Sequence, residues 1–449
     1  MRRGTRRSPY HPSVTLDTQI SRDVAPTSPQ SPDDAPAPRP TARVVDEPLS
    51  ANRDFRTILA SQGVSALGDA VSFTALPLLV LSLTGSGLAM GVVGALEMLP
   101  DLLFGMVAGA LADRSDRKRM MFLADAGRAG LVATIPVSVA LGGPTMGVIL
   151  VVAAPISILR TIFLAGYTAS VPSLVGRPQV ARANSIFEAV YSVGFIVGPA
   201  IAGLLSATIG PGPTLAIDAV SFGLSALALY FVRRDLRAPI DRPRPGLVSE
   251  IREGIEFIAH HPVLRAVILL WGAMSIATAP LVTALAVHIT RDLRMEDTVL
   301  GLILTAYGIG TVVGSLLTSR FARRPVAPVL LGGTFATGCL LLLVATQTQV
   351  PVLLAVAVAA GVAQSMVLVT YITLRTVLSP DALLGRIGST ARTISLGLQP
   401  IGMLLGGALI DLTSGSTTIA AMGLTLAGLG IVFTPIRALR RATVQPARA

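Results

Sequence analysis

Four ionisable side chains interrupt stretches of this sequence that are otherwise apolar: Asp69, Glu97, Asp101 and Arg160. A carboxylate that is shielded from water binds a proton readily, and it releases that proton again when it is exposed to water. Glu97 and Asp101 are four residues apart, so a helix would place them on one face. We therefore expect Asp69 or Glu97 to carry a proton, with Asp101 as a further proton-coupling candidate.

Five further charged residues lie nearer the ends of such stretches. We expect Asp125, Arg128 and Asp218 to have structural roles there. Glu188 and Arg392 occupy equivalent positions of an internal repeat. They could form a gate between two halves of the molecule, or they could be two separate charges at a membrane surface, and the sequence leaves both interpretations open.

The elements that must position these residues are long apolar helices. Of the 449 residues, 52% are hydrophobic and 14% are charged, whereas soluble domains carry about 25% charged residues. Apolar segments of about 20 residues, enough to cross a bilayer, alternate with short polar connections. The sequence thus predicts an all-α integral membrane protein of twelve transmembrane helices in two pseudo-symmetric six-helix halves. The predicted helices span residues 56–83, 88–112, 120–141, 146–171, 183–207, 213–232, 263–288, 299–320, 327–346, 350–376, 386–411 and 417–436.

The domain organisation follows from where polar residues collect. Proline, serine, arginine and aspartate dominate the first 50 residues, a composition that predicts disorder. A shift of 204 residues aligns predicted helix 5 with predicted helix 11, matching Gly198 to Gly402 and Gly203 to Gly407. Such repeats are typical of transporters with a central site between two halves. The predicted units are a tail (1–50), an N-terminal half (51–232), a linker with an amphipathic helix on the membrane (233–262), a C-terminal half (263–437) and a second tail (438–449).

Basic residues are distributed unevenly between the connections. Most of the 36 arginine and lysine residues lie in the two tails or in connections on one side, and the opposite side has only Arg291 and Arg294. The positive-inside rule then predicts that both termini are cytoplasmic and that the protein lies in a cytoplasmic membrane. This distribution, with an aromatic content of only 4%, argues against a nucleic-acid partner for the net charge of +11.

The connection after predicted helix 2, GALADRSDRKRMM, resembles the signature loop of the major facilitator superfamily. The acid of this loop, Asp113, opposes the dipole of the helix that it ends, so we expect it to face cations or the start of predicted helix 11 near Ser389. Asp116 replaces the family's usual glycine, and the equivalent loop of the second half, SRFARRP, has no acid. The resemblance implies a one-sided cytoplasmic gate that includes Gly109, Asp113, Arg114 and Arg117.

Predicted helix 5 carries a motif similar to that of drug/proton antiporters. Its small residues are four apart and would form a groove for a neighbouring helix, and its proline would bend it. The motif comprises Gly194, Gly198, Pro199 and Gly203, with Ala202 in place of one glycine. This stretch, with LLGRIGSTARTISLGLQPIGMLLGGALID and EGIEFIAHHPVLR, resembles the branch that contains enterobactin and macrolide exporters.

The same resemblance relates Arg160 to a helix-4 arginine that takes part in proton transfer. After residue 298 the only acids are Asp381 and Asp411, so proton coupling is expected in the first half. The second half should supply substrate contacts. The candidates are Trp271, Tyr307, Gln364, Tyr371 and Gln399, although aromatic residues also anchor helices at lipid interfaces.

Other chemistry finds little support in the sequence. No G-x-x-x-x-G-K-[ST] motif is present, so an ion gradient rather than a nucleotide should supply energy. Cys339 is the only cysteine, and His260 and His261 are adjacent rather than on one helix face, which predicts no disulfide, no metal site and no cofactor. No nucleophile arrangement suggests an enzyme.

The sequence therefore predicts a secondary transporter that exports a small, partly apolar compound by proton antiport. Its expected partners are that compound, protons and the lipid bilayer, and the chain is expected to be monomeric, although its oligomeric state is not readable. An importer on the same scaffold and a non-transporting membrane sensor are the alternatives.

Overall fold

The computed structural model describes residues 48–143, 145–236, 247–321, 326–380, 383–436 and 439. Nearly all of the predicted tails and part of the predicted linker lie outside these ranges. Within them the chain is helical, without strands. Twelve of its helical segments are long and apolar enough to cross a membrane, which confirms the predicted fold class. The elements are α1 (Arg53–Thr84), α2 (Gly87–Arg114), α3 (Arg117–Ala140), α4 (Thr145–Val175), η2 (Arg177–Gln179), α5 (Val180–Ile209), α6 (Pro211–Thr214), α7 (Ala216–Phe231), α8 (Leu247–His260), α9 (Pro262–Thr278), α10 (Leu281–Val287), η3 (His288–Asp292), α11 (Asp297–Phe321), α12 (Val326–Thr346), α13 (Val350–Leu378), α14 (Leu384–Gly397), α15 (Gln399–Leu412) and α16 (Gly415–Val432).

Short polar residues define where the first helices begin. Asn52 accepts a hydrogen bond from the Phe55 amide at the start of α1, and Ser86 accepts one from Ala89 at the start of α2. Asp116, the residue that departs from the signature loop, accepts one from the Arg119 amide and so caps α3. These caps satisfy amide groups that have no partner within their own helix. A glycine at position 116 would lack this oxygen.

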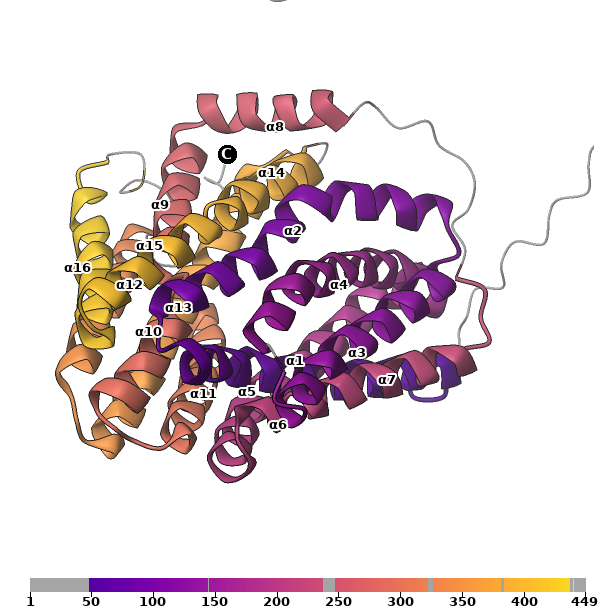
Figure 1. Ribbon diagram of the computed structural model, residues 1–449. Helices are drawn as coiled ribbons and strands as arrows, with labels where there is room; N and C mark the ends of the chain where they lie inside the picture. The colour runs from indigo at the N-terminus through magenta and orange to yellow at the C-terminus, as the bar shows by residue number, and fades with distance from the viewer. Residues whose placement is uncertain are drawn as a thin grey trace, which may run out of the picture. The chain divides into compact units, whose positions relative to one another are not determined.

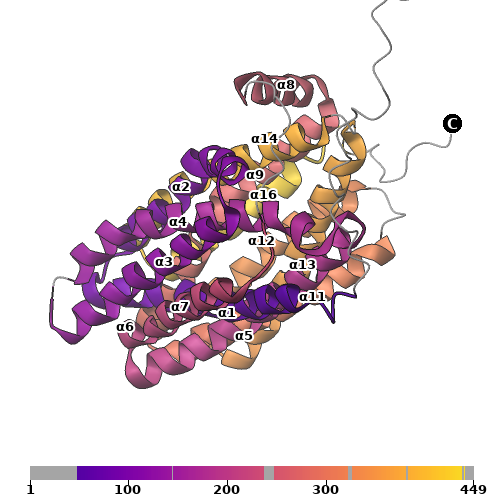
Figure 2. The same cartoon turned by 90° about the vertical axis from the view of Figure 1, so that its right-hand side faces the viewer.

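The helices pack in the same pattern on each side of the linker. In the N-terminal group, α1 to α7, helix α1 contacts α5 and α7, α2 contacts α4, and α3 contacts α7. In the C-terminal group, α9 to α16, α9 contacts α14 and α15, α11 contacts α13, and α12 contacts α16. Figures 1 and 2 show the indigo-to-magenta helices gathered beside the orange and yellow ones. The matching pairs give the two groups their pseudo-symmetry.

The two groups touch through α5 with α11 and through α2 with α15. Glycines make these contacts close. A Cβ atom added to Gly301 in α11 would overlap the carbonyl oxygen of Pro199, and one added to Gly91 in α2 would overlap that of Met403. Backbone therefore packs on backbone here, which only residues without a side chain allow.

Two of the predicted spans are broken helices. The span predicted at 263–288 consists of α9, α10 and η3, with a break at Pro280, and that at 386–411 consists of α14 and α15, with Pro400 in the first turn of α15. Proline lacks the amide hydrogen that would continue the helix. The break at Pro280 packs against the middle of α15, because Gly406 lies against the ring of Pro280 and Gly402 against the carbonyl oxygen of Ile276.

The linker contains α8, which lies beside α14 (Figure 1). Glu253 of α8 forms an ion pair with Arg386 of α14. Gly254 lets the helices approach, since an added Cβ would meet the Thr390 hydroxyl. Ile258 is buried and Ile255 is half exposed. The linker helix is thus attached to the C-terminal group, and its contact with a membrane surface remains a prediction.

Candidate functional site

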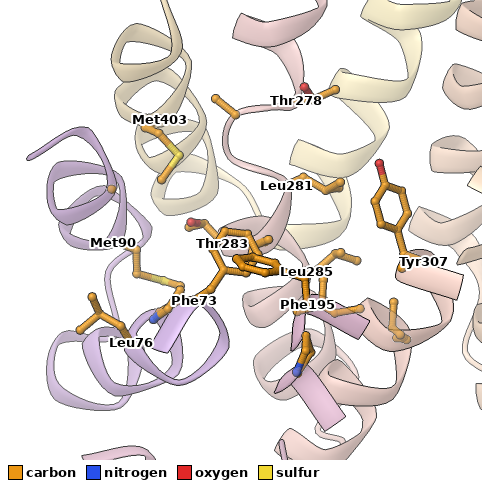
Figure 3. Close-up of a pocket in the computed structure, with 18 of the residues that line it drawn as sticks. Phe73, Leu76, Met90, Phe195, Thr278, Leu281, Thr283, Leu285, Tyr307 and Met403 are labelled. Atoms are coloured by element: carbon orange, nitrogen blue, oxygen red, sulfur yellow. The ribbon is translucent and has the colours of Figure 1, made fainter. Parts of the chain in front are cut away.

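A cavity of about 460 Å³ lies between the two groups of helices. Apolar and aromatic side chains from both groups surround it (Figure 3). Glu97 is the only acidic residue in its lining, and no arginine, lysine or histidine of the described residues contributes. The residues of the lining drawn and labelled are Phe73, Leu76, Met90, Phe195, Thr278, Leu281, Thr283, Leu285, Tyr307 and Met403.

Three of the five predicted substrate contacts line this cavity: Tyr307, Gln364 and Gln399. The Gln364 side-chain oxygen is buried and has no hydrogen-bond partner among the described residues, so a ligand could supply one. The other two, Trp271 and Tyr371, do not line the cavity. Their rings stack on each other with centroids 4.8 Å apart. Tyr371 lies two helical turns, about 10 Å, beyond Gln364 along α13, which places it past the end of the cavity.

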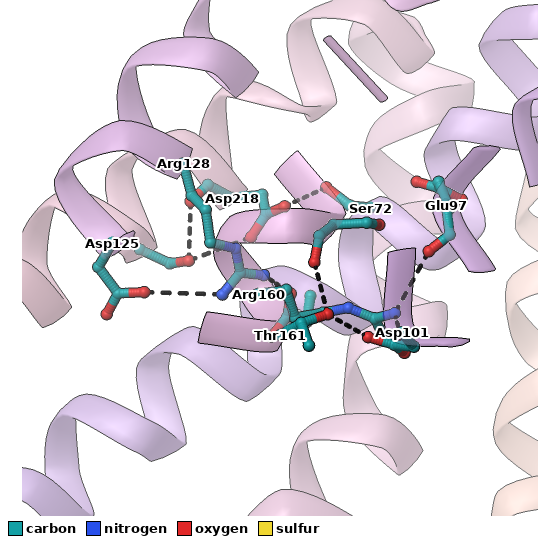
Figure 4. A network of polar contacts seen from close by, with 11 residues as sticks. Ser72, Glu97, Asp101, Asp125, Arg128, Arg160, Thr161 and Asp218 are labelled. Carbon is teal, nitrogen blue, oxygen red and sulfur yellow. Dashed lines mark hydrogen bonds and ion pairs between the residues drawn. The ribbon is translucent and has the colours of Figure 1, made fainter. Parts of the chain in front are cut away.

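Of the predicted proton-coupling residues, Asp101 and Arg160 form one ion pair (Figure 4). Nη2 of Arg160 lies 2.7 Å from Oδ2 of Asp101, and the Thr161 hydroxyl donates to the other carboxylate oxygen. Arg160 also donates to the backbone oxygen of Glu97 at 3.4 Å. Within the described part of the chain the Glu97 side chain has no ion pair, so it faces the cavity with its carboxylate unneutralised.

Asp69 belongs to a second set of charges. Its Oδ1 accepts a hydrogen bond of 2.6 Å from Arg128 of α3. Arg128 also lies 3.6 Å from Asp125, and Asp218 of α7 accepts a hydrogen bond from Ser72. The sequence had suggested separate structural roles for Asp125, Arg128 and Asp218 near helix ends. The structure instead joins them to Asp69 in one buried network.

The signature loop makes its described contacts within the N-terminal group. Asp113 lies 3.9 Å from Arg117, and Arg117 donates to the backbone oxygens of Ala112 and Ala169. This ties the end of α2 to α4. Arg114 is exposed, and no atom would meet a Cβ added to Gly109. Whether Asp113 reaches the start of α14 is untested, because the Ser389 side chain lies outside the described residues.

The other predicted gate pair is Glu188 and Arg392. Glu188 and Arg392 are both exposed, and no ion pair between them occurs in the described ranges. Their meeting in another state of the protein stays a prediction.

The motif of helix 5 places its small residues against two neighbours. Gly194 and Gly198 face α1, where added Cβ atoms would meet Ala66 and Ala70. Gly203 faces α11, and Pro199 lines the cavity. The motif therefore packs α5 closely between α1 and α11 at the side of the cavity.

Sequence reasoning missed the network around Arg128, although a signal was present. In α1 the polar or small residues Ser65, Gly68, Asp69 and Ser72 recur at helical spacing, and in α7 so do Asp218, Ser221 and Ser225. Both patterns place polar groups on one buried face of an apolar helix. Two such faces must meet each other or a charged partner, since lipid offers none.

Twelve membrane-length helices in two similarly packed groups, with ionisable groups beside a cavity between them, define a multi-pass membrane transporter. The model of the transmembrane secretion effector family matches residues 47–448. The chain belongs to this family, which is part of the major facilitator superfamily.

Individual relatives agree with this assignment. The chain is 31% identical to the multidrug efflux pump Tap of Mycobacterium tuberculosis over 398 residues, which cover 87% of this chain and 94% of the pump. It is 28% identical to macrolide efflux protein A of Streptococcus pyogenes over 60% of this chain and 67% of that protein. The solved structure of nucleoside transporter NupG superimposes with a TM-score of 0.70 at 12% identity, covering 87% of this chain and all of that one, which shows a shared fold.

Proposed function

We propose that the protein exports small, largely apolar compounds by exchanging them for protons. The observation that carries this proposal is the apolar cavity between the two groups, in which Glu97 is the only acid. A carboxylate that faces such a cavity and forms no ion pair within the described residues can be neutralised by a proton or by a positively charged substrate. The two ligands then compete for one site, which is the requirement for exchange.

The lining of the cavity supports a substrate with an apolar body. Phe73, Phe195 and Tyr307 offer ring surfaces, and Gln364 and Gln399 offer a few polar contacts. This predominance of apolar over polar groups suits recognition of a substrate by its shape and apolar surface, with few hydrogen bonds. The named activities of the relatives, multidrug and macrolide efflux, fit such a cavity. We infer a substrate that is uncharged or positively charged and of drug size.

Transport requires that the cavity open to each side in turn. A proton and a substrate can drive this cycle only if they favour opposite-facing states, since a ligand with equal affinity for both shifts neither. Protonation of Glu97 from the outside would release the substrate there. Return of the proton to the cytoplasm would restore the charge that binds the next substrate molecule.

The test uses purified protein in proteoliposomes with an acidic lumen. A macrolide such as erythromycin and the lipophilic cation ethidium are supplied outside. We expect both to accumulate in the lumen against their gradients, with protons released outward. Glu97→Gln should abolish accumulation, because a neutral amide cannot exchange a proton. Glu296→Gln is the matched control, since Glu296 is exposed and lies outside the cavity lining.

Three results would contradict the proposal. Accumulation that follows the proton gradient in the same direction would indicate an importer. Binding of both compounds without any transport would indicate a sensor. Full proton-driven accumulation by the Glu97→Gln variant would remove Glu97 from the mechanism.

A further inference from the structure

A cluster of charged and hydroxyl side chains fills the contact between α1, α3 and α7. Asp69 and Ser72 come from α1, Asp125 and Arg128 from α3, and Asp218 from α7 (Figure 4 shows all but Asp69). The guanidinium of Arg128 lies 3.6 Å from the centre of the Phe222 ring, which closes the cluster on one side. This Arg128 cluster is separate from the Asp101–Arg160 pair.

The charges of the cluster do not balance. The cluster holds three carboxyl groups, and Arg128, the one basic side chain that pairs with any of them in the described part of the chain, pairs with two, Asp69 and Asp125. Asp125 and Asp218 are almost fully buried. Buried charges of one sign that lack a counter-ion are strongly unfavourable, so the cluster needs protons or another small cation to be neutral.

Unpartnered polar atoms point to the same need. Neither of the two buried carboxylate oxygens of Asp125 has a hydrogen bond of ordinary geometry among the described residues, although Arg128 lies 3.6 Å from Oδ1 and Ser225 is beside the carboxylate. Such incomplete hydrogen bonding of a buried carboxylate is uncommon, because most buried polar groups are hydrogen-bonded. A proton on Asp125 would create the missing donor.

One residue connects the cluster to the substrate cavity. Ser72 lines the cavity, and its hydroxyl donates a hydrogen bond of 2.5 Å to Oδ2 of Asp218. Gly68, one turn earlier, permits this approach, because an added Cβ would overlap Ser221 and lie against Asp218. The cavity is thus joined to the cluster through a single hydroxyl.

We propose that the Arg128 cluster is a second proton-binding site, with Asp218 as the acceptor and Ser72 as the relay from the cavity. This inference rests on the proposed proton antiport. A water molecule in the cavity gives a proton to the Ser72 oxygen as Ser72 passes its own proton to Asp218. An O–H bond forms on Asp218, the water becomes hydroxide that the cavity solvent neutralises, and the reverse path releases the proton.

The charge of the Arg128 cluster acts on ionisable groups outside the cluster. Glu97 of α2 and Tyr191 of α5 are close enough to Asp69 to feel its charge, and Arg160 of α4 acts on both of them. The facing titratable groups are therefore Asp69, Asp125, Arg128, Asp218, Glu97, Tyr191 and Arg160. The two sites should load and unload protons in a linked way.

The experiment counts the protons released when substrate binds to purified, weakly buffered protein in detergent, with a pH-sensitive dye. Ethidium and erythromycin are the probes. Wild-type protein should release more than one proton per substrate molecule. Asp218→Asn and Glu97→Gln should each release about half as many, and the double variant should release almost none. Glu296→Gln should match wild type.

A second variant separates the relay from the site. Ser72→Ala should leave the number of released protons unchanged and should slow their release several-fold, since the acceptor remains but its path is lost. If Asp218→Asn does not fold, Asp125→Asn replaces it, with unfolding temperature and ethidium affinity at high pH as checks on folding.

The outcomes distinguish this inference from the proposed function. No proton release by wild-type protein would contradict proton antiport itself. Proton release by wild type that Asp218→Asn and Asp125→Asn leave unchanged would overturn the second site alone. A dependence of substrate binding on sodium that these variants abolish would also overturn it, because the cluster would then bind sodium instead of protons. Proton release by the Ser72→Ala variant at the wild-type rate would overturn the proposed role of Ser72 as the relay.

Discussion

At the scale of single residues, the two acids of α2 near the cavity, Glu97 and Asp101, differ in how they are paired. Both carboxylate oxygens of Asp101 have donors, Arg160 and Thr161. Glu97, one turn away, has none in the described residues and faces the cavity. A group held by strong charge-assisted hydrogen bonds resists protonation, whereas an unpaired group can exchange a proton. Asp101 is therefore suited to hold Arg160 in place, and Glu97 is suited to exchange the proton.

The pairing of Asp101 with Arg160 can be measured by a double-mutant cycle. We expect Asp101→Ala and Arg160→Ala each to lower the free energy of unfolding, because each leaves a charge without its partner. The double variant should be less destabilised than the sum, with a coupling energy of about 1 kcal/mol, a low value because both side chains are partly exposed. Denaturation of the purified protein in detergent gives the four free energies. Strict additivity would show that the pair contributes nothing.

At the scale of elements, the sequence predicted the number and position of the membrane helices because length and apolarity alone decide them. It did not predict the breaks in the seventh and eleventh spans, since an apolar run that contains Pro280 or Pro400 still reads as one span. Nor did it predict that Asp69 of α1 would share Arg128 with Asp125 of α3. Such meetings depend on how helices rotate against each other, and a single sequence does not contain that information in readable form.

An acid of the second half caps a helix of the first half. Asp411, near the end of α15, accepts hydrogen bonds from the Ser86 hydroxyl at 2.6 Å and from the amides of Gly87 and Leu88 at the start of α2. A carboxylate at a helix N-terminus is favoured by the free amides and by the helix dipole. By the predicted orientation these ends are on the outer side, so Asp411 would help to hold that side closed.

Removal of this cap should favour opening on the outer side. Asp411→Ala removes charge-assisted hydrogen bonds worth about 1 to 3 kcal/mol, so the ratio of outward-open to outward-closed molecules should rise about 5- to 150-fold. Spin labels at the exposed residues Leu83 and Leu412, after replacement of Cys339 by alanine, would report the separation of α1 from α15. Thr413→Ala, two residues further along the chain, is the control. An unchanged distance distribution would show that Asp411 does not hold the outer side closed.

At the scale of the whole membrane-spanning unit, the close contacts between the two groups are concentrated at one end. The cap of Asp411, the approach of Gly91 to Met403 and that of Gly203 to Gly301 all lie toward the ends predicted to be outside. Toward the opposite ends, Glu188 and Arg392 are exposed and form no ion pair with each other in the described ranges. This arrangement is what a molecule closed to the outside would show. Because the two groups pack alike, closing the other side requires mainly that they rock against each other.

That rocking motion predicts when Glu188 and Arg392 should meet. They are equivalent residues near the predicted cytoplasmic ends of α5 and α14, which belong to different groups, so closure of that side should bring them closer together. In a protein without Cys339, cysteines that replace Glu188 and Arg392 should form little disulfide while the molecule is closed to the outside. Adding Asp411→Ala, which favours the opposite state, should raise the yield several-fold, as judged by gel mobility after oxidation. A matched pair with one cysteine moved to Arg182, two turns away on α5, should respond less. A disulfide yield that is already high without Asp411→Ala, or that Asp411→Ala does not change, would mean that the two groups do not alternate about the cavity.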